Sequence, residues 1–260
     1  MPDASEVRDQ AAQKKRSTRW AYVILGVLLV AMVVLRVMVV LYKIPSGAMI
    51  PTLVPGDHVF ATRGGAAARG DVIVFPYPLN LDQSFMKRVI GVPGDELLFV
   101  DGQPVINGFR VPHCRVGPYD GSELFIEWLG DHAYGILLDG PVDGGTCDKD
   151  SDCGGAQSCH SGICGIVQGP WRVEPGQVFV VGDNRMNSHD SRSWDGGLGM
   201  GLATSLISGR ARTIAVGGFS GRTFAAVDGP PVLPESAASL RPALEKCWKE
   251  KPAVTSPPGR

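Results

Sequence analysis

The chain has almost no net charge, because its 260 residues include 25 Lys and Arg residues and 26 Asp and Glu residues. Bulk nucleic-acid binding depends on an excess of basic side chains, so this balance argues against it. Long periodic helical segments are also scarce outside the N-terminus, whereas Gly and Pro are abundant, at 34 and 20 residues. This composition favours a mainly β fold of strands and turns, in one sizeable domain with appendages.

Long apolar sequence is confined to one stretch, residues 20–42, which is almost wholly apolar and contains one charged residue, Arg36. At 1.5 Å per residue, a helix of this length reaches roughly 33 Å, enough to cross the hydrocarbon core of a membrane. No Ala-x-Ala-like cleavage site follows, so we expect a transmembrane helix that stays in place as an anchor. Five basic residues precede it and only Lys43 follows closely, which predicts a cytoplasmic tail over residues 1–19 and an outer location for the rest.

The cysteines lack the spacing of a metal site. Five of the six lie within residues 110–169, a Gly- and Asp-rich range that we interpret as a Cys-rich insertion. Four of them are separated by gaps of five, five and four residues, whereas structural zinc sites favour Cys-x2-4-Cys pairs: Cys147, Cys153, Cys159 and Cys164. Outside a membrane, disulfides are the better interpretation. Three pairings are open, and Cys114 and Cys247 either form a further bridge or remain free. No metal or cofactor is expected.

Apolar runs bounded by turn residues predict most of the strands. A hairpin is expected where Asp101 and Gly102 separate two such runs. The predicted strands cover residues 57–62, 72–75, 84–90, 96–100, 103–107, 177–181 and part of 206–216. A C-terminal extension over residues 217–260 follows, with a short amphipathic helix expected at 237–249.

Three other stretches are candidates for a functional site. Residues 44–53, Ile-Pro-Ser-Gly-Ala-Met-Ile-Pro-Thr-Leu, form an irregular turn, and composition alone favours a linker leaving the membrane over a site. Residues 87–95 are Lys-Arg-Val-Ile-Gly-Val-Pro-Gly-Asp. Residues 182–192, Gly-Asp-Asn-Arg-Met-Asn-Ser-His-Asp-Ser-Arg, directly follow an apolar strand. A dense polar run in that position is typical of a loop that reaches a site.

The order and contents of these stretches resemble the type I signal peptidase family. Its boxes are Ser-x-Ser-Met-x-Pro-Thr-Leu, Lys-Arg-x-x-Gly-x-Pro-Gly-Asp and Gly-Asp-Asn-Arg-x-Asn-Ser-x-Asp-Ser-Arg, and residues 69–75 match a further family strand. The resemblance runs from residue 20 to about residue 216, without the Cys-rich insertion. It implies a β-rich catalytic domain over residues 43–216, on the outer surface of the cell membrane, which is periplasmic or extracellular.

The resemblance also implies roles for individual residues. Lys87 would be the general base, a role that requires burial to disfavour its charged form. Ser46 would help to hold the oxyanion, and Ser188 would orient the Lys87 amine. The supporting residues of the third box would be Asp183, Asn184, Arg185, Asp190 and Arg192, with the last two paired as ions.

The implied substrates are secretory precursors, whose signal peptides would be cut off after small residues of the Ala-x-Ala type. Ile44, Pro45 and Met49 match positions that line shallow pockets, which would exclude larger side chains sterically. The peptide would lie extended beside an exposed sheet edge. The implied partners are therefore signal peptides and membrane lipid, with no nucleic acid.

Ala48 stands where the family has its nucleophilic serine, and a methyl group cannot attack a carbonyl. Three explanations compete: an engineered substitution, a natural loss of hydrolysis, or attack by Ser46 instead. Ser46 is displaced by two residues, and a misplacement of even about 1 Å can cost about a hundredfold in rate. The sequence therefore predicts either a hydrolytically impaired endopeptidase or a non-catalytic homologue that binds precursor peptides.

Overall fold

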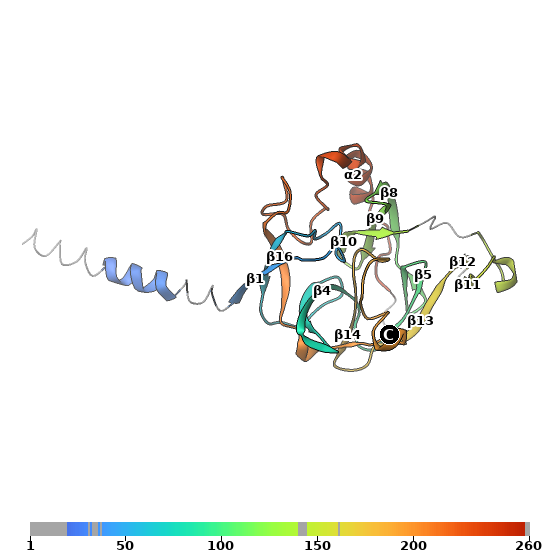
Figure 1. Cartoon of the computed structure of the whole chain (residues 1–260), viewed down its shortest axis with the longest axis horizontal. Coiled ribbons are helices and arrows are strands. Elements are labelled where there is room, and N and C mark those ends of the chain that lie inside the picture. The colour runs from blue at the N-terminus through green and yellow to red at the C-terminus, as the bar shows by residue number, and fades with distance from the viewer. Residues whose placement is uncertain are drawn as a thin grey trace, which may run out of the picture. The chain divides into compact units, whose positions relative to one another are not determined.

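The computed structural model describes residues 20–30, 32, 36, 38–139, 145–160 and 162–257 (Figure 1). Backbone contacts divide the chain into two units, with the boundary between Val40 and Leu41. The second unit is mainly β, as the composition predicts. The boundaries predicted for the catalytic domain, the insertion and the C-terminal extension stay predictions.

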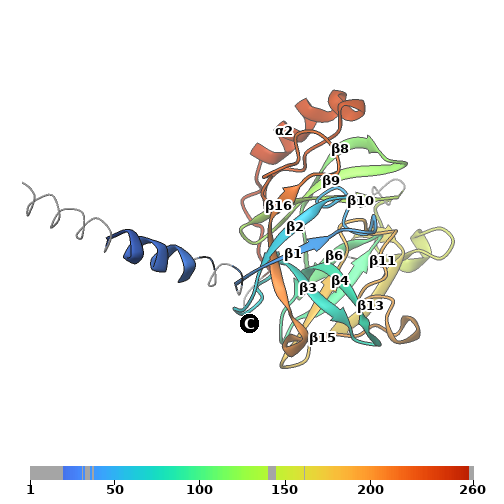
Figure 2. The same ribbon diagram turned by 60° about the vertical axis from the view of Figure 1, so that its left-hand side comes forward.

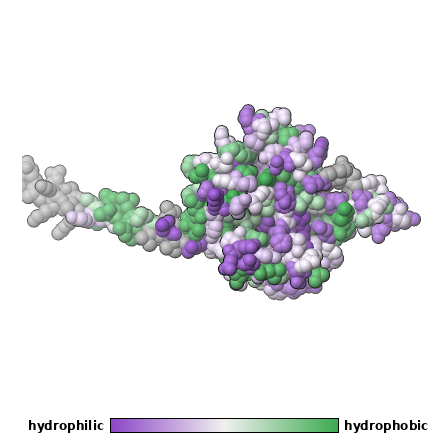
Figure 3. Space-filling view, in the orientation of Figure 1, coloured by the Kyte–Doolittle hydropathy of each residue, from purple (hydrophilic) through white to green (hydrophobic). Residues whose placement is uncertain are grey.

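In the N-terminal unit, residues 20–30 are helical and their apolar side chains are exposed, so this segment is mostly green in Figure 3. The expectation of a helix that continues to Tyr42 is wrong at its end, because Val39–Lys43 forms strand β1. Val and Tyr suit a strand as well as an apolar helix, so hydropathy alone does not separate the two. Among the described residues, no helix has the length and hydropathy needed to cross a membrane. The predicted tail and residues 31, 33–35 and 37 of the predicted span lie outside the described residues.

A seven-stranded sheet carries the predicted motifs. Its order is β1-β2-β16-β3-β4-β14-β15, and every neighbouring pair whose register is described is antiparallel. The strands after β1 are β2 (His58–Thr62), β3 (Val72–Tyr77), β4 (Asn80–Gly91), β14 (Gln177–Val181), β15 (Leu202–Ala203) and β16 (Gly209–Val216). This confirms the strands predicted in these regions of the sequence.

Two further sheets complete the body of the unit (Figure 2). One has the order β13-β5-β6-β7, and its β5–β6 pair confirms the predicted hairpin, with Asp101 and Gly102 both at positive φ. The other is a meander of order β10-β9-β8. The bounds are β5 (Glu96–Val100), β6 (Gln103–Ile106), β7 (Phe109–Arg110), β8 (His113–Tyr119), β9 (Ser122–Leu129), β10 (His132–Leu138) and β13 (Val167–Arg172).

The strands β9 and β10 belong to the hydrophobic core although they lie within the range interpreted as an insertion. Phe125 and Ile136 pack in one buried cluster with Leu97 of β5 and Phe179 of β14. A second cluster joins the outer face of this meander to the C-terminal helix α2 (Arg241–Lys249), which lies beside β8 in both ribbon views. Helix α2 and the preceding 3-10 turn, Glu235–Leu240, confirm the predicted C-terminal helix.

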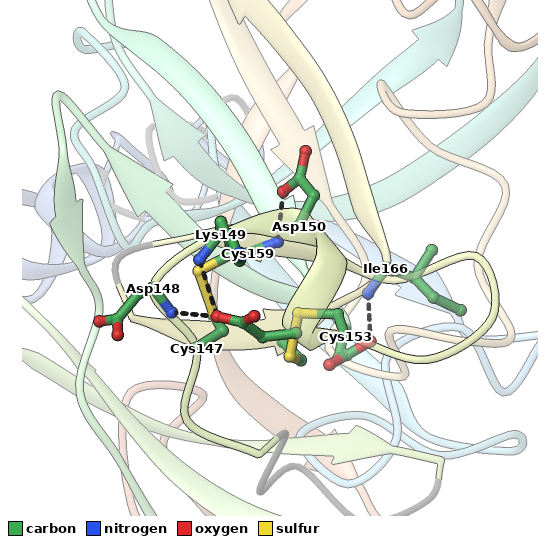
Figure 4. Close-up of a disulfide and its surroundings, with 10 residues drawn as sticks. Cys147, Asp148, Lys149, Asp150, Cys153, Cys159 and Ile166 are labelled. Carbon is green, nitrogen blue, oxygen red and sulfur yellow. Dashed lines mark hydrogen bonds between the residues drawn. A yellow bond between two sulfur atoms is a disulfide. The ribbon is translucent and has the colours of Figure 1, made fainter.

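All six cysteines are paired. Cys114 of β8 bonds to Cys247 of α2. The pairs Cys147–Cys159 and Cys153–Cys164 link the segment before a small hairpin to its two strands, β11 (Ser158–His160) and β12 (Ile163–Gly165). Figure 4 shows this hairpin, where the Asp150 carboxylate accepts the Cys159 N–H at 2.7 Å. The short 3-10 turn Asp150–Asp152 precedes it. The disulfide interpretation is thus confirmed, with one of the three pairings selected.

Candidate active site

The turn at residues 44–53 is fixed in the fold and is not a free linker. Ile44 exchanges backbone hydrogen bonds with the segment before β2, donating to Asp57 O at 2.8 Å and accepting from Gly56 N at 2.9 Å. Met49 and Leu53 are buried in a core cluster with Val59 and Ile214. The turn therefore presents its remaining side chains from a rigid base.

The loop at residues 182–192 is tied directly to that turn. The Asn184 N–H donates to the carbonyl of Ala48 at 3.1 Å, and the Asn184 side-chain amide donates to the carbonyl of Gly47 at 3.2 Å. A Cβ at Gly182 would collide with Ser188 Oγ and come within 2.5 Å of Ala48 O. A residue without a side chain is therefore required at 182 for the two segments to approach this closely.

Lys87 lies on β4, where only 4% of its surface is exposed, and its Nζ donates to Ser188 Oγ at 2.9 Å. Burial lowers the Lys87 pKa from 10.5 to about 8, against the opposing attraction of Asp190. Desolvation disfavours the ammonium form, so a substantial fraction of the amine is neutral in mildly alkaline solution. The structure thus brings together the lysine and the serine that the sequence predicts as partners.

Asp190 continues the chain of contacts behind Ser188. Although burial alone would raise its pKa, the Arg192 guanidinium and hydrogen bonds from Gly182 and Ser188 hold the Asp190 pKa below its usual range. Arg192 donates to both Asp190 oxygens at 2.9 Å, and its Nη2 also donates to the Arg185 carbonyl at 2.6 Å. Asp190 therefore remains an anion that orients the Ser188 hydroxyl.

Two buried ion pairs support the same loop. Asp183 accepts from Arg88 Nε and Nη2 at 2.8 and 2.7 Å and from the Thr52 hydroxyl at 2.5 Å, which links the loop to β4 and to the turn. Arg185 pairs with Glu127 of β9 at 2.5 Å, with neither side chain exposed. Removing one partner of a buried pair leaves an uncompensated charge, so these contacts fix the loop strongly.

The turn, β4 and the loop surround one cleft with a volume of about 470 Å³. Ser46, Ala48 and Lys87 line it together, as do the predicted pocket residues Ile44, Pro45 and Met49. Ser188 reaches the cleft through its contact with Lys87. The three stretches picked from the sequence therefore lie around one site, although the contacts alone do not test the roles predicted for them.

Several residues of the site were not predicted. His189, Phe85 and Asn187 line the cleft, and Thr52 and Glu127 hold its supporting charges. His189 and Met186 occupy variable positions of the third box, so the motif carries no signal for them. Phe85 lies two residues before Lys87 within an ordinary strand sequence, which carries no signal for a site residue. Glu127 lies in a strand that no predicted element covers.

The chemistry available in the cleft is that of an amine base beside a hydroxyl. Ala48 has no group that can attack a carbonyl. Ser188 and Lys87 are already hydrogen-bonded to each other. Three sulfur atoms elsewhere lie within 4.8 Å of one another, those of Cys147, Cys153 and Cys164, but each is engaged in a disulfide and is not a free thiolate ligand.

Comparison with known proteins gives a consistent result. A family model described as "Signal peptidase, peptidase S26" matches residues 17–216. The chain is 31% identical over 190 residues to a signal peptidase I of Pseudomonas fluorescens, covering 65% of this chain and 60% of the relative. It is 31% identical over 185 residues to a signal peptidase I of Bacillus caldolyticus, covering 69% of this chain and 82% of the relative. The chain thus spans about 60% of the length of the Pseudomonas relative.

A solved structure of a signal peptidase I from Enterococcus faecalis V583 aligns with 56% of this chain and 97% of its own, at 22% identity. Its TM-score of 0.31 is too low to support an argument about the fold.

Proposed function

Because the chain belongs to the signal peptidase family, peptidase S26, we propose that its cleft receives the signal peptides of secretory precursors for endoproteolytic removal after small residues. We propose further that hydrolysis is impaired in this chain, since Ala48 stands where the family has its serine. The relatives named signal peptidase I support the general activity.

One observation carries the proposal: Lys87, with its pKa lowered to about 8, donates to Ser188 within reach of the cleft that Ala48 lines. A buried neutral lysine is costly to maintain, and its use is to take a proton. In the proposed role, a hydroxyl at position 48 would attack the scissile carbonyl while Lys87 Nζ accepts its proton. Ser188 would orient the amine, and Ser46 would donate to the developing oxyanion.

The small residues expected before the cut fit the walls of this cleft. Ile44 and Met49 line the cleft and are themselves almost wholly buried, so their side chains form fixed apolar walls. We propose that these walls, with Pro45, admit Ala and Gly and exclude larger groups by steric clash.

Restoring the hydroxyl is the direct test. Ala48→Ser should cleave a fluorogenic Ala-x-Ala precursor peptide at least about 10⁴-fold faster than the unchanged chain, because removal of a catalytic serine costs on this order. The rate of Ala48→Ser should rise with pH, reach half of its maximum near pH 8, where half of the Lys87 amine is neutral, and level off at higher pH. Ala48→Gly is the matched control, since it changes the same position without adding a hydroxyl.

Two results would contradict the proposal. Turnover by the unchanged chain that Ser46→Ala abolishes would make Ser46 the nucleophile. An inactive Ala48→Ser variant that still binds precursor peptide would make the chain a peptide-binding homologue.

We also propose that the apolar residues from 20 to 38 hold the chain in a cell membrane with the N-terminus in the cytoplasm and the cleft outside. The exposed apolar side chains of residues 20–30 and the five basic residues before them support this arrangement. The full chain should resist extraction by alkaline carbonate, and a chain without residues 1–38 should be released. Retention of the shortened chain would refute the anchor.

A further inference from the structure

His189, on the rim of the cleft, is held from two sides by hydroxyl groups. Its Nε2 lies 3.0 Å from the Tyr77 hydroxyl, and its Nδ1 lies 3.0 Å from Ser193 Oγ. A neutral imidazole has one donor and one acceptor nitrogen, and a hydroxyl group can serve either. Because the Ser193 hydroxyl donates its one hydrogen to the Asp190 carbonyl, a neutral ring donates from Nδ1 to Ser193 Oγ and accepts at Nε2 from the Tyr77 hydroxyl.

The ring also packs into an aromatic group that includes the neighbour of Lys87 on β4. Tyr77 of β3 stacks on Phe85 with ring centroids 4.8 Å apart, and His189 meets the two rings edge to face at 5.4 and 6.3 Å. Phe85 in turn lies 5.6 Å from Lys87 Nζ. These contacts join the loop at 182–192 to β3 and to β4, the strand that carries the lysine.

The position of His189 in the chain gives these contacts a consequence for Ser188, which precedes it directly. Ser193 Oγ accepts from the Asp190 N–H and donates to the Asp190 carbonyl, both at 3.2 Å, so the segment after His189 is closed by a short turn. Fixing the ring to Tyr77 therefore limits rotation of the backbone that carries the Ser188 hydroxyl.

We propose that His189 is a positioning residue that holds Ser188 Oγ against Lys87 Nζ through its bridge to Tyr77 of β3. Of the two hydrogen bonds described for the ring, the bridge to Tyr77 is the one that reaches another strand, since Ser193 belongs to the same segment as His189. Through His189, the fixed position of β3 therefore restrains the position of Ser188. The inference deepens the proposed function, but the first of its two tests is independent of hydrolysis.

The first test uses the full chain with Ala48 in place, purified in detergent. Titration of Lys87 is followed by NMR on lysine labelled at the ε-carbon, with Lys87→Met to assign the signal. Ser188→Ala removes the serine contact directly, so the Lys87 pKa of this variant is the reference for the other variants. His189→Ala and Tyr77→Phe should shift it in the same direction, whereas Tyr119→Phe, a hydroxyl on β8, should leave it unchanged. An unshifted Lys87 pKa in His189→Ala, or in Ser188→Ala itself, would overturn the proposal.

Two conservative variants separate the two contacts of the ring. The Gln amide extends to about the place of Nε2 and can reach Tyr77, whereas the shorter Asn amide corresponds to Nδ1 and can reach only Ser193. His189→Gln should therefore retain the Lys87 titration of the unchanged chain, and His189→Asn should behave like His189→Ala. The reverse order would overturn the role of the Tyr77 bridge. Thermal unfolding by circular dichroism checks that each variant is folded.

The second test measures kinetics in the Ala48→Ser background. His189→Ala should lower kcat about tenfold, the loss that one neutral hydrogen bond gives, with KM unchanged. In Ala48→Ser/Ser188→Ala, the same substitution should have little further effect, because its target is already absent. A raised KM with unchanged kcat would show a substrate contact instead, and an additive loss would show a general structural role. If Ala48→Ser is inactive, the proposed function fails, and the titration still decides the role of His189.

Discussion

Burial of Lys87 lowers its pKa from 10.5 to about 8. The same burial of the charged amine lowers the stability of the folded state. Below pH 8 the lysine is protonated in both states, and the ammonium loses hydration when the chain folds. Above pH 10.5 it is neutral in both states and this cost is gone. Stability should therefore rise as pH increases from about 8 to 10.5, where the unfolded chain binds the additional proton.

Lys87→Met should accordingly stabilise the chain at pH 7 by up to about 3 kcal/mol, because Met fills a similar volume without a charge. The gain should shrink between pH 8 and 10.5 and disappear above that range. Guanidinium unfolding followed by tryptophan fluorescence at a series of pH values measures it. Lys249→Met, at an exposed position, is the control and should show no such pH dependence. A gain that does not vary with pH would mean that the lysine is not the source of the cost.

At the residue scale, the sequence located the main components of the site because the boxes combine several rare residues in fixed order. The boxes predicted that Ser46, Ala48, Lys87 and Ser188 belong to one site, although Ser46 and Ser188 are more than 140 positions apart in the sequence. It did not predict His189, whose contacts with Tyr77 and Phe85 depend on the packing of β3 against β4. A contact between a variable motif position and an ordinary strand residue leaves no local pattern.

At the scale of elements, strands with clear apolar runs or turn signals were predictable. The β5–β6 hairpin follows from Asp101 and Gly102, since both adopt the positive φ that a two-residue turn requires. The meander β8–β10 was not predicted, in part because β9 has Glu127 between apolar residues. A carboxylate in a strand suggests an exposed face, and the partner that allows its burial, Arg185, lies 58 residues away.

The same meander supports the site from behind. Tyr134 of β10 donates to Glu127 at 2.7 Å and lies against the Arg88 guanidinium, 3.8 Å from its ring centroid. Arg88 pairs with Asp183, and Glu127 pairs with Arg185. The two ion pairs that link the loop to other strands therefore both contact β9 or β10. Burial and the Glu127 charge raise the Tyr134 pKa well above its usual value, which keeps the hydroxyl a donor. The β9–β10 pair thus helps to hold the loop of the candidate site in place.

At the scale of the whole molecule, the disulfides differ in how much chain they close. Cys114–Cys247 joins residues 133 positions apart and fixes helix α2 to β8, whereas Cys147–Cys159 closes a separation of 12 residues within one small hairpin. A cross-link stabilises a protein largely by restricting the unfolded chain, and the effect grows with the length of the closed loop. Cys247 is also buried in the cluster that packs the helix on the meander.

Replacing both Cys114 and Cys247 with Ala should therefore lower the free energy of unfolding by up to about 5 kcal/mol, against about 3 kcal/mol for the matched replacement of Cys147 and Cys159. Guanidinium unfolding of both double variants, without reductant, compares the two losses. The larger loss should appear as a lower midpoint for the whole unit, because α2, the meander and the site share one set of packed strands. An equal or greater loss from the Cys147 and Cys159 pair would contradict the loop-length argument. It would then show that the small hairpin stabilises the body of the unit as much as the C-terminal helix does.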